Sequence, residues 1–164
     1  MKAIIAMAQN RVIGKNNGLP WPSIKEDFKW FKEFTMGKTL IVGKTTFDTL
    51  PLLKNRECLV LTKQVEDIDA YITNQYLVNN NAMTGQMITM EDVESYSRFR
   101  KDYLIVVGGA KTYVKLLSYI TEFYVTHVNG NYDGDTFMPE FEHLFAHQEV
   151  VKEFDGHKVV KYTK

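Results

Sequence analysis

Short apolar runs alternate along this chain with stretches of helical spacing, and no other feature of the sequence constrains the fold as strongly. The apolar runs lie at 3–8, 39–42, 58–62, 103–107 and 123–128, and the helical stretches at about 24–35, 45–50, 91–99 and 110–118. Such alternation is typical of α/β proteins, in which helices cover both faces of a mostly parallel sheet. We therefore predict an α/β fold with a central mixed, mostly parallel sheet and helices on both faces.

The C-terminal end of the chain departs from this pattern. Two runs with strand character, 149–154 and 157–162, flank the dipeptide Asp155-Gly156. A two-residue turn of this kind between two strands is a strong signal for a β-hairpin. The sheet is therefore expected to end in an antiparallel hairpin.

The third predicted helix has a recognisable start signal. Thr89 and Asp92 have the spacing at which a hydroxyl and a carboxylate exchange hydrogen bonds with the backbone of the first helical turn. Acidic residues then come first, while Arg98, Arg100 and Lys101 come last, which is the order that the helix dipole favours. We expect the helix to begin just after Thr89.

Residues 64–88 have the least regular pattern in the chain. Asn79-Asn80-Asn81 and Thr84-Gly85-Gln86 interrupt any helical or strand period, although 71–72 and 76–78 are apolar enough to form short strands. We predict a loop-rich insertion over this segment.

Length, charge and cysteine content exclude several classes of protein. A chain of 164 residues has the size of one domain, here expected to span 1–164. Lys+Arg and Asp+Glu each total 20, so the chain has no excess of positive charge that would indicate nucleic acid as a partner.

The single Cys58 excludes an internal disulfide and an all-cysteine metal site, and no metal is expected. The apolar run at 3–8 is too short for a secretory signal or a membrane span, which indicates a cytosolic protein without a membrane partner.

Asp27 is the one charged residue on the apolar face of the first predicted helix. It shares that face with Ile24, Phe28, Phe31 and Phe34. A buried carboxylate is costly unless something donates hydrogen bonds to it. Two structural explanations are a salt bridge and a helix-capping role. The functional explanation is a carboxylate that faces a ligand with paired N–H donors.

Two glycine-containing junctions between a strand and a helix indicate phosphate binding. One runs over 42–46 and the other over 105–113, and each carries a lysine. The first is not a P-loop, because Gly37 and Gly43 are six positions apart where that motif needs five, and the Gly-x-Gly-x-x-Gly dinucleotide fingerprint is absent. Two such junctions at a switch in strand order would suit one dinucleotide.

The irregular stretch at 10–22 is typical of a loop that covers a binding site.

The motifs together resemble a known family. The matching segments are Arg11-Val12-Ile13-Gly14, Gly18-Leu19-Pro20-Trp21, Asp27 with Trp30-Phe31-Lys32, Gly43-Lys44-Thr45-Thr46-Phe47, Arg56, Val107-Gly108-Gly109, Tyr113, Tyr124-Val125-Thr126-His127 and Gly134-Asp135-Thr136. Their order and approximate spacing are those of dihydrofolate reductases, and the tail is similar to that family's closing hairpin. The chain is identified on these residues as a member of that family.

The resemblance implies a role for each matching residue. The catalytic set would be Asp27, Trp21, Thr126 and Tyr113, with Asp27 on the 2-amino and N3 edge of the pterin. The substrate would lie against Ile4, Ala6, Phe28, Phe31, Leu50, Leu53, Val107 and Thr126, with Arg56 on its α-carboxylate. The cofactor would lie along Ala6, Ile13, Gly14, Asn17, Gly18, Gly43, Lys44, Thr45, Thr46, Gly108, Gly109, Ala110, Lys111, Thr112 and Tyr113.

Lys44 and Lys63, with Thr62, stand where the resemblance implies recognition of a 2′-phosphate, which favours NADPH over NADH. Lys44 and Lys111 replace arginines that are usual in the family, so the charge is retained while the planar fork of the guanidinium is lost. Ala110 stands where a third glycine is common.

The activity that the resemblance implies is NADPH-dependent reduction of 7,8-dihydrofolate to tetrahydrofolate, which serves one-carbon and thymidylate metabolism. Hydride would reach C6 of the pterin, N5 would take a proton from water, and the loop at 10–22 would close over the site. Dihydrofolate and antifolate inhibitors are the expected ligands, and a monomer the expected state. Two alternatives are a riboflavin-pathway-type pyrimidine reductase and a catalytically silent nucleotide-binding structural protein of the same fold.

Overall fold

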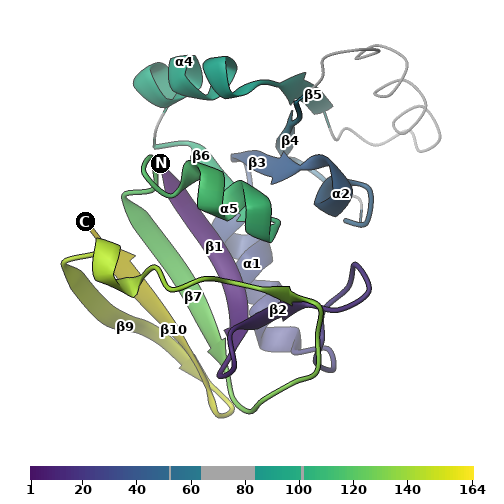
Figure 1. Ribbon diagram of the computed structural model, residues 1–164, viewed down its shortest axis with the longest axis vertical. Coiled ribbons are helices and arrows are strands. Elements are labelled where there is room, and N and C mark those ends of the chain that lie inside the picture. Colours follow the sequence, from purple (N-terminus) through teal and green to yellow (C-terminus); the bar gives the residue numbers. More distant parts are fainter. Residues whose placement is uncertain (52, 64–83, 101) are drawn as a thin grey trace.

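The structure is a computed structural model that describes residues 1–51, 53–63, 84–100 and 102–164. It is built around one eight-stranded sheet (Figure 1). Its strands are β1 (Lys2–Ala8), β3 (Thr39–Gly43), β4 (Glu57–Leu61), β5 (Thr84–Ile88), β6 (Leu104–Gly108), β7 (Glu122–Val128), β9 (His147–Phe154) and β10 (His157–Thr163). Across the sheet they lie in the order β5-β4-β3-β6-β1-β7-β10-β9.

The direction of the strands confirms the predicted mixture. From β5 to β7 all neighbouring strands are parallel, whereas β7 pairs with β10, and β10 with β9, in antiparallel fashion. The last two strands form the predicted hairpin, and its turn residues Asp155 and Gly156 both have positive φ, at 36° and 79°. A turn with two left-handed residues matches the twist of a two-stranded ribbon, so the sheet ends antiparallel as expected.

Helices cover both faces of the sheet, as predicted. They are α1 (Lys25–Thr35), α2 (Lys44–Phe47), α4 (Met90–Arg100) and α5 (Ala110–Leu116), with a short 3₁₀ helix η1 (Glu142–Leu144). In Figure 1, α5 lies in front of the sheet and α1 behind it. Successive residues of β1 point to opposite faces, so Ala3 and Ile5 join the cluster under α4 and α5, and Ile4 joins the cluster under α1 and α2.

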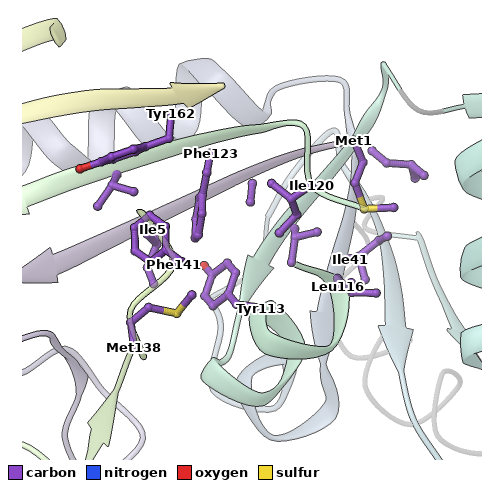
Figure 2. Close-up of a cluster of buried hydrophobic side chains, with 14 of the residues drawn as sticks. Met1, Ile5, Ile41, Tyr113, Leu116, Ile120, Phe123, Met138, Phe141 and Tyr162 are labelled. Carbon is purple, nitrogen blue, oxygen red and sulfur yellow. The ribbon is translucent and has the colours of Figure 1, made fainter. Parts of the chain in front are cut away.

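The larger cluster packs the segment after β7 onto the sheet (Figure 2). Phe123 of β7 and Phe141 are both completely buried, and their ring centroids lie 4.8 Å apart. Tyr113 of α5 lies on another side of Phe123, at 5.6 Å. Truncating a buried phenylalanine to alanine typically costs about 3–5 kcal/mol, so this cluster is a main source of the fold's stability.

The predicted ends of the helices agree with the observed ends within about two residues, except at the end of α2. The backbone N–H of Thr89 donates to Asp92 Oδ2 at 2.7 Å, which confirms the predicted start of α4. Helix α2 was expected to reach residue 50 but ends at Phe47. Pro51 follows shortly afterwards, and a residue that precedes proline is disfavoured in the helical region.

The prediction of a loop through residue 88 is wrong for its last five residues, which form β5. Met87 and Ile88 are buried and pair in parallel with Val60 and Leu61 of β4. Gly85 and Gln86 hide the strand from a periodicity search, and the neighbouring strand supplies the burial that stabilises it. The short strands considered at 71–72 and 76–78 lie outside the described residues.

A second sheet of two strands was not predicted. It pairs β2 (Val12–Gly14) with β8 (Thr136–Phe137) in antiparallel fashion and joins the 10–22 loop to the segment after β7. Neither strand is long enough to show a period of its own. Within the described part of the chain, the helices are too short or too polar to cross a membrane.

Candidate active site

The parallel strands place their carboxyl ends at one edge of the sheet, and a cleft of about 1470 Å³ opens there. It is walled by the ends of β1, β3, β4 and β6, by one side of α1, by the starts of α2 and α5, and by the 10–22 loop. In open α/β sheets this edge is where ligands bind, at the point where the strand order reverses. Pockets for one small ligand measure roughly 300–1,000 Å³, so this cleft has room for two ligands side by side.

Asp27 faces this cleft from the inner side of α1 and is half-buried. Burial raises the pKa of its carboxyl group, while the Thr126 hydroxyl and the charge of His157 act in the opposite direction. Neither structural explanation for Asp27 holds, because it forms no salt bridge with the described residues and Ile24, without a side-chain cap, occupies the N-cap of α1. The carboxylate is therefore directed at the cleft.

Thr126 lies behind Asp27 on β7 and is 1% exposed. Its hydroxyl has no hydrogen-bond partner among the described residues, although it lies near enough to the Asp27 carboxylate to lower the pKa of that group. The hydroxyl therefore lies beside the carboxylate, although the geometry between them falls short of a formed hydrogen bond. A buried hydroxyl in this position is able to orient Asp27.

Arg56, directly before β4, is a buried cation in the lining of the same cleft. The side chain is 7% exposed, its Nε finds no hydrogen-bond partner in the described part of the chain, and burial lowers the pKa of the guanidinium. Leu50 and Leu53 line the wall beside it. A buried guanidinium with an unsatisfied donor favours a carboxylate ligand, which it can bind through two parallel hydrogen bonds.

The two glycine junctions meet at the other end of the cleft. A Cβ atom on Gly43 would lie 2.6 Å from Thr112 Oγ1, and one on Gly109 would lie 2.6 Å from Thr46 Oγ1. Each junction therefore packs closely on the other, and neither position has room for a side chain. The peptide bond between Gly108 and Gly109 is cis. Strands β3 and β6 are neighbours in the sheet, so the structure brings the two predicted phosphate-binding segments together as one surface.

Positive charge dominates the lining of the cleft. Among the described residues, its cations are Lys32, Lys44, Lys54, Arg56, Lys63, Lys111 and Lys115, against the two carboxylates Asp27 and Asp135. A cleft lined mainly by one sign of charge attracts ligands of the opposite sign. The lining therefore suits anionic ligands, with phosphates next to the glycine junctions and a carboxylate next to Arg56.

Tyr113 reaches from α5 to the first strand. Its hydroxyl donates a hydrogen bond of 2.6 Å to the backbone carbonyl of Ile4, and burial raises the pKa of the phenol, so it stays protonated. Both residues line the cleft. The hydrogen bond ties α5 to β1 in the wall of the cleft.

The 10–22 loop is held over the cleft by polar contacts with the segment around β8. The backbone N–H of Asn16 donates to Asp135 Oδ2 at 2.7 Å, and Lys15 Nζ lies 2.8 Å from Asp133 Oδ2. Both contacts lower the pKa of the aspartate concerned. Arg11, at the base of the loop, donates to the carbonyl of Met138 at 2.8 Å. The loop position therefore depends on residues more than a hundred positions further along the chain.

Of the predicted site residues, all but Trp21 and Thr126 line the cleft. Trp21, near the end of the 10–22 loop, is 5% exposed, and its ring makes an edge-on contact with Tyr132 at 5.7 Å between centroids. Residues to which the sequence assigned no site role also line the cleft, namely Ile5, Leu19, Lys32, Met36, Thr49, Pro51, Lys54, Asn55, Leu61, Lys115, Asp135, Thr136 and Phe137. Lys115 follows Lys111 by four positions and was detectable from helical spacing, whereas Phe137 had no local signal.

Comparisons with known proteins agree on one family. The family model described as dihydrofolate reductase matches residues 1–163. The type 8 dihydrofolate reductase of Escherichia coli is 34% identical, over 100% of this chain and 95% of that protein. The dihydrofolate reductase of Buchnera aphidicola subsp. Baizongia pistaciae is 33% identical, over 86% of this chain and 78% of that protein. A solved structure, dihydrofolate reductase from Enterococcus faecalis complexed with NADP(H) and RAB-propyl, has a TM-score of 0.73 at 27% identity and covers 99% of this chain and 94% of that one.

Proposed function

The chain belongs to the dihydrofolate reductase family, and we propose that the cleft at the carboxyl edge of its sheet is where it reduces dihydrofolate with NADPH. The reaction is 7,8-dihydrofolate plus NADPH plus a proton giving tetrahydrofolate plus NADP⁺. The pocket between α1 and Arg56 would take the folate, and the glycine junctions would take the dinucleotide. The cleft volume and its excess of cations support two anionic ligands.

One observation carries the assignment of the folate pocket. Asp27 and Arg56, of opposite charge, line one pocket, and neither forms a salt bridge with the described residues. Buried charges left in this way cost stability unless a ligand pairs with them. Dihydrofolate has N–H donors at its pterin end and a carboxylate at its glutamate end, so it can pair with both.

The residues near Asp27 would supply electrostatics rather than a direct proton. The anionic carboxylate would hold the 2-amino and N3 edge of the pterin and stabilise the positive charge that develops as N5 is protonated. Thr126 would keep the carboxylate in position. Phe28 and Phe31 would exclude water on the α1 side, and the 10–22 loop would exclude it on the other. Water would deliver the proton to N5, because the proposed pose places Asp27 at the pyrimidine edge.

The glycine junctions fit the cofactor, which supplies the hydride when bound. Gly43 and Gly109 leave backbone exposed where a Cβ would collide with a threonine hydroxyl, and so allow close approach of a pyrophosphate. Lys111 would add charge at the pyrophosphate, and Lys44 and Lys63 at the 2′-phosphate.

The test is a spectrophotometric assay of NADPH oxidation with and without dihydrofolate. Oxidation that requires dihydrofolate and is lost in Asp27→Asn is expected. A chain that binds NADPH but shows no dihydrofolate-dependent oxidation would be the catalytically silent alternative, and turnover of a ribosylated pyrimidine in place of dihydrofolate would indicate the riboflavin-type alternative.

A further inference from the structure

Lys44 does not face the cleft as an isolated cation. Its Nζ lies 3.0 Å from Oδ2 of Asp48, four residues further along, where the chain leaves α2. Lys44 lines the cleft and Asp48 is not among the lining residues. The carboxylate therefore lies on the outer side of the ammonium group, within hydrogen-bonding distance of it.

The order of the two charges argues against a role in helix stability. Pairs four residues apart stabilise a helix best when the acidic residue comes first, because the acid then lies near the positive end of the helix dipole. Here the lysine comes first and the aspartate last, and α2 has only four residues. The effect of the ion pair is therefore expected at the cleft, where Asp48 reduces the positive charge that Lys44 offers to a ligand.

A comparison with Lys63 shows what the pair changes. Both lysines are exposed and line the end of the cleft assigned to the 2′-phosphate, and Lys63 forms no salt bridge with the described residues. A phosphate that approaches Lys63 meets a full positive charge. A phosphate that approaches Lys44 meets an ammonium group already shared with a carboxylate, and that carboxylate repels the phosphate.

We propose that Asp48 is a specificity-determining residue that weakens the preference of this enzyme for NADPH over NADH by competing with the 2′-phosphate for Lys44. The inference rests on the proposed role of Lys44 in cofactor binding. NADH has no 2′-phosphate, so Asp48 affects its binding little. Asp48 thus holds the affinity for NADPH below the value that the lysines alone would produce.

The decisive variant is Asp48→Asn, which keeps the shape of the side chain and removes its charge. Dissociation constants for NADPH and NADH are measured on the full chain by quenching of tryptophan fluorescence, at low and at high salt. Binding of NADPH is expected to tighten about two- to fivefold, the range of an exposed charge interaction, with NADH unchanged. The gain should shrink at high salt, because exposed charges are screened. Asp102→Asn, an exposed aspartate outside the cleft lining, is the matched control.

Lys44→Gln separates this inference from the proposed function. If Lys44→Gln weakens NADPH binding and Asp48→Asn tightens it only while Lys44 is present, the inference stands. If Lys44→Gln weakens binding but Asp48→Asn leaves it unchanged or weakens it, Asp48 is neutral or orients the lysine, and the inference is overturned. If Lys44→Gln changes nothing, the assigned role of Lys44 fails, and the inference fails with it.

Discussion

The cleft holds charged groups of two kinds: the wall assigned to the substrate includes one that is half-buried and one that is buried, whereas the lysines assigned to the cofactor are exposed. Asp27 and Arg56 represent the first kind, and Lys44, Lys63 and Lys111 the second. A buried charge interacts strongly and is screened little by salt, while an exposed one contributes less and is screened readily. The difference indicates that chemistry and substrate recognition depend on single residues, and cofactor affinity on a sum of small contributions.

The largest effect is expected from Asp27→Asn. The amide keeps the shape of the side chain but cannot stabilise the protonated pterin, so hydride transfer at pH 7 should slow by about a hundredfold or more. The loss should shrink in acid, where solvent supplies part of the protonation. Pre-steady-state oxidation of NADPH from about pH 5 to 9 measures this. Glu26→Gln, on the outer side of α1, is the control, and equal rates for Asp27→Asn and the parent at pH 7 would limit Asp27 to a structural role.

Arg56→Lys should have the next largest effect, on binding of dihydrofolate. Lysine keeps the charge but loses the planar pair of donors, and a charge-assisted hydrogen bond contributes about 1.5–3 kcal/mol, so KM should rise roughly ten- to a hundredfold. The carboxylate is remote from the reacting atoms, which leaves kcat nearly unchanged. Steady-state kinetics at two salt concentrations check both points. An unchanged KM would mean that the carboxylate binds elsewhere, most simply at Lys32 or Lys54.

Lys63→Glu tests the exposed lysines and should have a smaller effect. Reversing one exposed charge near the 2′-phosphate is expected to reduce the ratio of kcat/KM for NADPH over NADH by about three- to tenfold at low salt. Unlike the effect of Arg56→Lys, this one should fade as salt is added. An effect that persists at high salt would contradict the contrast between the two kinds of charged group.

The smallest expected effect is on stability. Burial raises the pKa of Asp27 above its value in the unfolded chain, so the ionised carboxylate destabilises the ligand-free fold at pH values above the folded pKa. This cost disappears as pH falls below the unfolded value of about 3.9, where both states are protonated. Asp27→Asn should therefore be more stable than the parent at pH 7, with the gap closing toward about pH 4. Urea midpoints at both pH values measure it, and a less stable variant at pH 7 would show that the carboxylate supports the fold.

Local sequence was sufficient for features that depend on residues close together in the chain. The face of α1 that carries Asp27 followed from helical spacing, and the hairpin at Asp155-Gly156 followed from turn chemistry. Local sequence did not predict that Trp21 and Thr126 would lie behind the cleft lining, because the depth of a side chain depends on what packs over it. The contact of Gly43 with Thr112 likewise requires β3 and β6 to be neighbours.

The sequence by itself determined the type and order of most elements, the inward face of α1 and the two lysine-bearing glycine junctions. Each of these rests on residues within a few positions of one another, where spacing alone decides the geometry. Only the tertiary structure decided that β5 is a strand, that β2 pairs with β8, and that Asp135 and Phe137 reach the cleft. The physical reason is that these features gain their burial and hydrogen bonds from partners distant in the chain, so no local pattern encodes them.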